Sequence, residues 1–151
     1  MTAPTVREWR RGEFVASTDP ARLDVDAIHA FLSERSYWAQ GIPLETVRRS
    51  IEHSLTIGVH HGDRMIAFAR VVTDYSVIAY LADVFVLEDY RGRGLGKWLV
   101  ELVTTHPDLQ NLRRWLLATR DAHTLYGRFG FQAADPTRLM DKLDPDVYRR
   151  R

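Results

Sequence analysis

The chain has 151 residues and a mass of 17.5 kDa, which fits one domain of ordinary size. It contains no cysteine, so disulfide scaffolds, thiol nucleophiles and cysteine-based zinc sites are excluded. Its net charge of +1 does not call for nucleic acid as a partner, and no apolar run approaches the ~18 residues of a membrane span. We expect a cytoplasmic protein with neither nucleic-acid nor membrane partners, built as one domain over residues 1–151.

The first third of the chain predicts one strand and two helices. Residues 1–12 are polar and are expected to be loose, and residues 13–17 predict a strand. Asp24 or Asp26 can cap a helix, whose apolar residues recur at helical spacing, at Ile28, Phe31 and Leu32. Pro43 is expected at the first position of a second helix, with an apolar face at Leu44, Val47 and Ile51.

The middle of the chain changes to the period of two that is typical of strands. Apolar residues alternate with polar or small ones from Leu55 onward. Three strands are predicted, over 55–59, 65–72 and 77–87. Turn residues separate them, which indicates two hairpins in succession and therefore an antiparallel meander. Asp83 is the only charged residue in the third strand.

The last third predicts two further helices and three strands. One helix has a continuous apolar face at Leu95, Trp98, Leu99, Leu102 and Val103. A short strand over 115–118 precedes a helix that Asp121 caps and Gly130 ends. Residues 131–134 and 139–143 predict a final strand pair. Together the elements indicate a mixed α/β sheet with helices on its faces.

A loop rich in glycine and basic residues joins the third meander strand to the next helix. Its glycines are Gly92, Gly94 and Gly96, and its basic residues are Arg91, Arg93 and Lys97. Glycines let main-chain N–H groups turn toward a ligand, and a helix start adds a positive partial charge. The glycine spacing fits neither the P-loop nor the Rossmann pattern. The loop therefore predicts a phosphate site of another type, with a flexible basic turn as the alternative.

Two segments match the signatures of one family. Residues 91–96 read Arg-Gly-Arg-Gly-Leu-Gly, and residues 125–131 read Leu-Tyr-Gly-Arg-Phe-Gly-Phe. The first matches an Arg/Gln-x-x-Gly-x-Gly/Ala signature and the second is similar to a Leu-Tyr-x-x-x-Gly-Phe segment, both of the GNAT superfamily of N-acetyltransferases. The resemblance implies an α/β fold whose central, mostly antiparallel sheet splays at a cofactor cleft and is flanked by about four helices.

The resemblance also implies that acetyl-coenzyme A is the co-substrate. The main chain of the third meander strand would pair with its pantetheine arm, and the N–H groups of the glycine loop would hold its pyrophosphate. Thr119 stands where many relatives have an asparagine that contacts the cofactor, and it can still donate one hydrogen bond. The implied cofactor-binding residues are Val84, Phe85, Val86, Arg91, Gly92, Arg93, Gly94, Leu95, Gly96, Lys97 and Thr119.

The implied reaction is direct transfer of an acetyl group to a primary amine. Tyr126 occupies the position of the family's general acid, which protonates the leaving thiolate; the alternative is a tyrosine of the core. Asp83 could accept the amine's proton or anchor a substrate cation, or it could form a salt bridge with an arginine. Ala82 replaces the first of two adjacent acidic residues of the polyamine-type relatives, which leaves the base open. Tyr80 is an alternative relay.

The acceptor is expected to be a small molecule. Tyr37 and Trp38 lie in the connection between the first two helices, which walls the acceptor pocket in this family, and aromatic faces there could receive a cation. The alternative is that both residues pack under a loop. Alternatives for the whole chain are an acetyltransferase of protein or peptide amines and a non-catalytic acyl-coenzyme A sensor. No metal is expected, because the histidines lack ligand spacing, and an exposed sheet edge would allow a homodimer.

Overall fold

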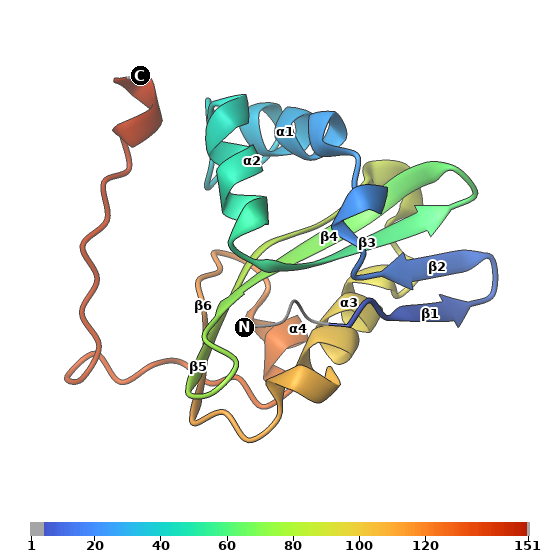
Figure 1. The fold of residues 1–151 in the computed structure, drawn as a ribbon. Helices are drawn as coiled ribbons and strands as arrows, with labels where there is room; N and C mark the ends of the chain where they lie inside the picture. The colour runs from blue at the N-terminus through green and yellow to red at the C-terminus, as the bar shows by residue number, and fades with distance from the viewer. Residues whose placement is uncertain (1–4, 151) are drawn as a thin grey trace.

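The computed structural model describes residues 5–150, which form one six-stranded sheet with four α-helices (Figure 1). The spatial order of the strands follows the chain, and all neighbours are antiparallel except the last pair, which is parallel. The strands are β1 (Glu8–Arg11), β2 (Phe14–Ser17), β3 (Leu55–His61), β4 (Arg64–Thr73), β5 (Ile78–Val86) and β6 (Arg114–Leu117). The helices are α1 (Val25–Glu34), α2 (Leu44–Glu52), α3 (Leu95–Thr104) and α4 (His123–Gly127). The meander, the parallel final strand and the helices confirm the mixed α/β fold that the resemblance implies.

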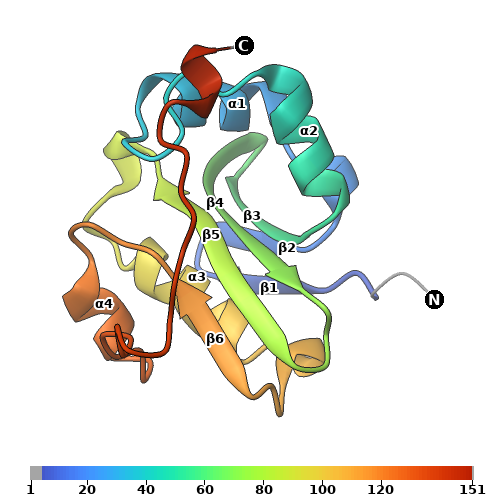
Figure 2. The same ribbon diagram turned by 90° about the vertical axis from the view of Figure 1, so that its left-hand side faces the viewer.

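The two faces of the sheet carry separate apolar cores. Helices α1 and α2 cover one face, and α3 and α4 cover the other (Figures 1 and 2). The α3 core contains Leu99 and Val103 together with Ile57 and Leu81 of the sheet. The other core is built by α1 and α2 against three sheet residues, Met65, Phe68 and Phe85. The sheet is therefore buried on both faces wherever a helix lies over it.

Helix starts follow the local chemistry of the chain, with two differences from expectation. The Asp24 carboxylate accepts the Ala27 N–H at 3.0 Å and caps α1 as expected. Pro43 is the N-cap of α2 rather than its first helical residue. Asp121 does not cap α4: its N-cap is Ala122, whose N–H donates to the Thr119 hydroxyl oxygen at 3.0 Å. Thr119 lies three residues before Ala122, and its hydroxyl reaches the Ala122 N–H. Asp121 lies directly before Ala122, and its carboxylate makes no capping hydrogen bond to α4.

The two ends of the chain depart most from the predicted elements. Strand β1 occupies residues 8–11, where a loose segment was expected; residues 1–4 lie outside the described part. The final strand pair over 131–134 and 139–143 is wrong, because the structure has no strand after β6 in its described residues. Residues 132–146, here called the C-terminal arm, instead contain a hydrogen-bonded turn at 136–138 and lie mostly exposed as far as the short 3-10 turn η4 (Val147–Arg149). Two prolines in the arm, at 136 and 145, each remove one N–H from any ladder.

None of the helices in residues 5–150 combines the length and the apolar composition that crossing a membrane would require.

Candidate active site

The sheet splays open between its last two strands. Strand β6 pairs with β5 only from Ile78 to Leu81, opposite Arg114 to Leu117. Strand β5 continues to Val86, and no described residue of β6 pairs with this second half. The β6 side of Val84–Val86 is therefore an open main-chain edge, which an extended ligand could join as an added strand.

A β-bulge lies where the splay begins. Phe68 pairs with Phe85 and Arg70 with Ala82, so that Asp83 and Val84 together oppose the single residue between Phe68 and Arg70. Asp83 has a left-handed φ of 55°, a conformation that aspartate adopts more readily than most residues. Bulges re-aim side chains, and this one directs the Asp83 carboxylate toward β4 and the α1–α2 connection.

The glycine loop forms the start of α3. Gly92 and Gly94 have φ values of 80° and 77°, which favour glycine strongly, and Gly94 is the N-cap of α3. The first free N–H groups of the helix follow directly, since the first internal bond runs from the Trp98 N–H to the Gly94 carbonyl. The Nε–H of Arg91 donates to the Val86 carbonyl at 3.1 Å, which ties the loop to β5. The loop can thus offer N–H groups and positive charge to an anion.

A cleft of about 510 Å³ joins the open edge, the glycine loop and α4. Eight of the predicted cofactor-binding residues line it, namely Val84, Phe85, Val86, Arg91, Gly92, Gly94, Leu95 and Gly96. Arg93, Lys97 and Thr119 are not among its lining residues. The Arg93 guanidinium lies 5.0 Å from the centre of the Tyr90 ring, and Thr119 is engaged at the start of α4.

Tyr126 brings a buried phenol to the same cleft. It lies on α4, and its ring packs edge-on against Phe131, with 6.0 Å between ring centres. Burial, with smaller contributions from Tyr37 and Asp121, raises the pKa of the Tyr126 hydroxyl above its ordinary value. The group is therefore protonated at neutral pH and can act as a proton donor.

Asp83 is held in a network of three side chains. Its Oδ2 accepts the Nε–H of Arg70 at 2.8 Å, and its Oδ1 accepts the indole N–H of Trp38 at 2.8 Å. Arg70 in turn donates to the Ser54 hydroxyl at 3.1 Å. The side chains of Asp83 and Arg70 are only 10% and 18% exposed. The salt bridge with an arginine, one of the alternatives predicted for Asp83, is thus present. Both oxygens of the Asp83 carboxylate already accept a hydrogen bond.

The α1–α2 connection reaches across the cleft to the segment after β6. The Arg120 main-chain N–H donates to the Tyr37 hydroxyl oxygen at 2.8 Å, and the Arg120 guanidinium lies 4.0 Å from the Tyr37 ring centre. Trp38 packs edge-on against Tyr37 at 5.0 Å. Tyr37 and Trp38 both line the cleft. Tyr80 does not, and its side chain is exposed on the open face of β5.

Phe31, Arg35 and Arg120 are among the cleft residues that the sequence did not predict as part of the site. Phe31 was predicted as core, and it also lines the cleft, stacked on Phe85 with 4.0 Å between ring centres. Arg35 and Arg120 add positive charge to the rim. Arg120 could have been suspected from its position three residues after β6, at the point where the strand leaves β5. Arg35, at the end of α1, has no comparable marker.

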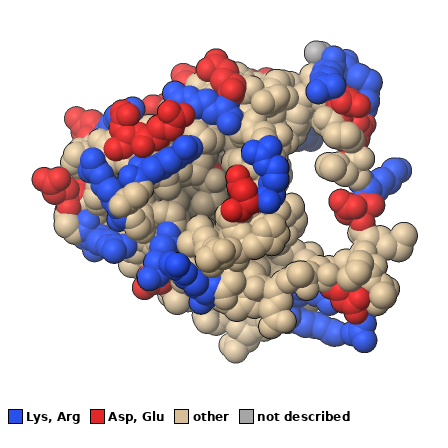
Figure 3. Space-filling view, turned by 180° about the vertical axis from the view of Figure 1, so that it is seen from behind, with Lys and Arg blue, Asp and Glu red and all other residues tan. Residues whose placement is uncertain are grey.

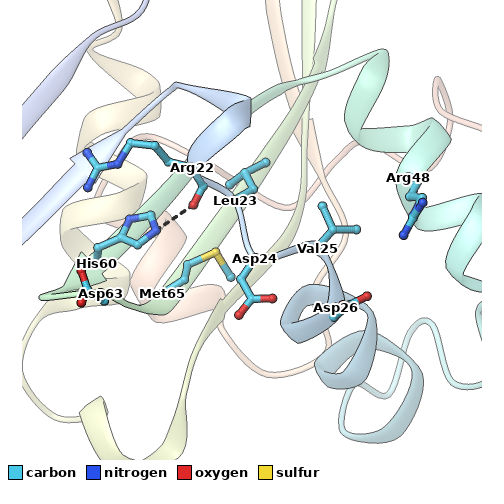
Figure 4. Close-up of a pocket in the computed structure, with 9 residues that line it drawn as sticks. All are labelled: Arg22, Leu23, Asp24, Val25, Asp26, Arg48, His60, Asp63 and Met65. Atoms are coloured by element: carbon cyan, nitrogen blue, oxygen red, sulfur yellow. Dashed lines mark hydrogen bonds between the residues drawn. The ribbon is translucent and has the colours of Figure 1, made fainter.

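A second pocket, of about 430 Å³, lies between the start of α1, the β3–β4 hairpin and α2 (Figure 4). Its charged residues are Arg22, Asp24, Asp26, Arg48 and Asp63. The Nε2–H of His60 donates to the Arg22 carbonyl at 2.9 Å. None of the predicted site residues lines this pocket. Within residues 5–150, no three His, Asp or Glu side chains are grouped so that they could hold a metal ion.

Comparisons with known proteins agree with this geometry. Residues 25–131 match the acetyltransferase (GNAT) family. A candidate acetyltransferase of Gibberella zeae is 30% identical over 144 residues, which cover 81% of this chain and 80% of that protein. A candidate GNAT-family acetyltransferase from Xanthomonas campestris pv. campestris, known from a crystal structure, is 47% identical with a TM-score of 0.86; the match covers 97% of this chain and 99% of that one.

A structure of a candidate acetyltransferase with acetyl-CoA, from Clostridium acetobutylicum, shares the fold at 14% identity and a TM-score of 0.61, covering 93% of this chain and 95% of that one. The family match spans the glycine loop, the splayed strands and α4, which are the elements that build the cleft. This chain therefore belongs to the GNAT family of acetyltransferases.

Proposed function

We propose that this protein is an N-acetyltransferase that moves the acetyl group of acetyl-CoA to a primary amine of a small molecule. The observation that carries the proposal is the juxtaposition, in one cleft, of a helix-start glycine loop, an open strand edge and the buried phenol of Tyr126. A loop that only bound an anion would not need a proton donor on the opposite wall.

The cleft fits the chemistry of an acyl-coenzyme A. Its glycine loop offers N–H groups and the charge of Arg91 to the pyrophosphate, with Arg93 and Lys97 adding charge nearby. The open edge of β5 at Val84–Val86 can hydrogen-bond the amides of the pantetheine arm. Thr119 would contribute one further hydrogen bond. Acetyl-CoA, when bound, supplies an acetyl group activated as a thioester.

Within this proposal each protein group has a separate task. Tyr126 would donate its hydroxyl proton to the leaving thiolate, because its raised pKa keeps that proton in place at neutral pH. A main-chain N–H near Val86 would stabilise the developing oxyanion. Asp83 would hold Trp38 and Arg70 in place beside the acceptor, since both of its oxygens are engaged. The amine's proton would then leave through Asp83 or through water.

A small acceptor is favoured because the cleft is spanned on its acceptor side. The contacts of Tyr37 with Arg120 join the α1–α2 connection to the segment after β6. A peptide chain would need this contact to open, whereas a small amine would fit beside Tyr37 and Trp38. Aromatic faces at this position suit a cationic or aromatic amine.

The test is an assay of coenzyme A release from acetyl-CoA with polyamines, amino acids, aminoglycosides, arylalkylamines and peptides. We expect turnover with one class of small amine, above the background without amine. Coenzyme A at about a hundred times its dissociation constant should also stabilise the fold by ~2.7 kcal/mol. Stabilisation without turnover on any amine would indicate a sensor, turnover on peptides alone would indicate a protein acetyltransferase, and the absence of stabilisation would refute the proposal.

A further inference from the structure

One row of residues crosses four strands at the end of the sheet beside the glycine loop. The row is formed by direct register partners from β1 to β4, namely Arg11, Phe14, His61 and Arg64. Residues paired directly across strands point to the same face of a sheet, and Phe14 packs against the α3 core. The row therefore faces the side of the sheet on which α3 begins, with an arginine at each end of an aromatic pair.

Tyr90, which directly precedes the glycine loop, packs across the middle of this row. Its ring contacts Phe14 edge-on, with 6.0 Å between ring centres. Its hydroxyl donates to Nδ1 of His61 at 2.8 Å, and the Nε2–H of His61 donates to the Glu13 carboxylate at 3.2 Å. A neutral histidine has one donor and one acceptor nitrogen, and these two bonds use both. Tyr90 is thus fixed through His61 to the turn between β1 and β2.

Three guanidinium groups surround Tyr90 and the start of α3. Those of Arg93 and Arg64 lie 5.0 and 5.7 Å from the centre of the Tyr90 ring. The third, of Arg11, lies against the helix start, because a Cβ built on Gly94 would be 3.6 Å from its nearest nitrogen. In the space-filling view, Lys and Arg side chains gather on the left, next to the hollow in this face (Figure 3). Arg11, Arg64 and Arg93 are here called the basic cluster.

The basic cluster lacks matching negative charge. Within residues 5–150 its one ion pair joins Arg64 to Asp89 at 3.9 Å, between side chains that are 57% and 81% exposed, while Arg11 and Arg93 form none. Like charges that are brought together repel each other. A bound anion would remove this repulsion and accept charge-assisted hydrogen bonds. Guanidinium groups match the geometry of phosphate oxygens, so the basic cluster fits a phosphate group.

Coenzyme A has one phosphate for which the cleft does not account. The open edge of Val84–Val86 and the glycine loop suit its pantetheine arm and its pyrophosphate. Its third phosphate is a monoester at the 3′ position of the ribose, beyond the pyrophosphate. The open edge of β5 faces β6, whereas the basic cluster lies on the β1 side of the same loop. A ligand that follows the open edge and passes the loop would therefore bring its nucleotide end to the basic cluster.

We propose that the basic cluster holds the 3′-phosphate of coenzyme A. Tyr90 is the platform that orients two of its arginines, and His61 is a positioning residue that keeps Tyr90 in place. The inference rests on the proposed function, since it names a further contact of the same cofactor. It gives the hairpin of β1 and β2 a part in cofactor binding. The reacting thioester lies at the other end of the ligand, so kcat should not depend on the basic cluster.

Calorimetry with coenzyme A and with 3′-dephospho-coenzyme A tests the site. We expect the wild-type protein to bind coenzyme A about 10- to 100-fold more tightly, as hydrogen bonds between charged groups allow. Arg11→Gln and Arg93→Gln should each weaken coenzyme A binding by about 5-fold or more and leave binding of the dephospho form nearly unchanged. Arg113→Gln is the matched control. Arg113 is also exposed, but its main chain pairs with Val77 before the start of β5, whereas the glycine loop follows the end of β5, so the affinity ratio should persist.

His61→Phe tests the positioning role, because it keeps a ring in the row and removes both hydrogen bonds. It should raise KM for acetyl-CoA and lower the affinity ratio, with kcat and the binding of the dephospho form unchanged, whereas general damage to the fold would weaken both ligands equally. Equal binding of the two ligands by the wild type, or a ratio that falls as far in Arg113→Gln as in the cluster variants, would overturn the site and leave the proposed function standing. If neither ligand binds, the proposed function itself fails.

Discussion

Replacing Tyr126 by phenylalanine removes one hydroxyl from the cleft while leaving its packing in place. The ring is buried and contacts Phe131 edge-on, and phenylalanine keeps both features. No hydrogen bond joins the Tyr126 hydroxyl to any other residue in the described part of the chain. The substitution should therefore change the free energy of unfolding by about 1 kcal/mol or less. Any large effect on turnover can then be assigned to the lost proton rather than to a damaged fold.

The expected kinetic effect follows from the protonation state. Because burial raises the pKa of Tyr126 above 10, the wild-type acid stays protonated from neutral to mildly alkaline pH. A lost general acid costs about 10²- to 10⁴-fold in rate, which corresponds to about 2.7 to 5.5 kcal/mol of barrier. We expect kcat of Tyr126→Phe to fall within this range, while the affinity for coenzyme A stays within about twofold.

The assay is coenzyme A release under saturating acetyl-CoA and the best amine, with affinity measured separately by calorimetry. Tyr75→Phe is the matched control. Tyr75 is also partly buried with a raised pKa, caused mainly by burial, but it lies at the β4–β5 turn outside the cleft, so kcat should not change. A Tyr126→Phe enzyme whose kcat stays within about threefold of wild type, with normal cofactor binding, would remove Tyr126 from the mechanism.

Further substitutions probe three features: the glycine loop, the network of Asp83 and the buried His106. Gly94→Ala should weaken coenzyme A binding and lower the free energy of unfolding by about 1 to 2 kcal/mol, because φ is 77° at Gly94. Gly127→Ala is the control, since φ is not positive there, and it should have neither effect. Equal effects of the two substitutions would contradict the role of the glycine loop in binding. Asp83→Asn and Arg70→Gln should both raise KM for the amine, measured at saturating acetyl-CoA, because both disrupt the same Trp38–Asp83–Arg70 network. A loss of about 100-fold in kcat for Asp83→Asn alone would instead identify Asp83 as the general base. Burial lowers the pKa of His106, whose Nδ1 accepts the Asp108 N–H, so the folded state binds fewer protons than the unfolded state and is destabilised as pH falls below about 6.5. Thermal melts from pH 7 to 5 should show a smaller loss for His106→Asn, and parallel curves would refute this role.

Much of the fold could be predicted because its signals are local. The spacing of Ile28, Phe31 and Leu32 identified α1, and all three are buried as predicted. Strand β1 was missed because only Trp9 in Glu8–Arg11 is partly buried, so no apolar alternation marks it; pairing with β2 stabilises it. Residues 139–143 show the opposite error, because their apolar side chains predicted a strand that the structure does not have. A strand also requires a neighbouring strand to hydrogen-bond with, and side-chain pattern alone does not reveal one.

The candidate site divides in the same way. The glycine loop and α4 were predictable because each is contained in a short segment. The links across the cleft were not, because they join residues far apart in the chain. Trp38 and Asp83 are 45 residues apart, and Tyr37 and Arg120 are 83 apart. Only the topology brings such pairs together. Asp83 illustrates the limit of sequence-based prediction. The sequence identified it as an isolated charge in an apolar strand, with a salt bridge among the alternatives, but only the structure identifies Arg70 and Trp38 as its partners.

The bulge at Asp83 also sets how the chain tolerates changes in length. Ala79 and Leu81 before the bulge pack in the α3 core, and Val84 and Val86 after it contact the same core. The interval of three residues between Leu81 and Val84 breaks the alternation, and it alone sends Phe85 to the α1 side to stack on Phe31. Deleting one residue from 82–84 would shorten this interval to two, the ordinary repeat of a strand, so Val84, Phe85 and Val86 would keep their present faces. The deletion would remove the bulge instead, and with it the backbone conformation that points Asp83 at Arg70 and Trp38. A single-codon deletion here should therefore spare the two cores and the cofactor edge of β5 while it separates Asp83 from its partners on the acceptor side.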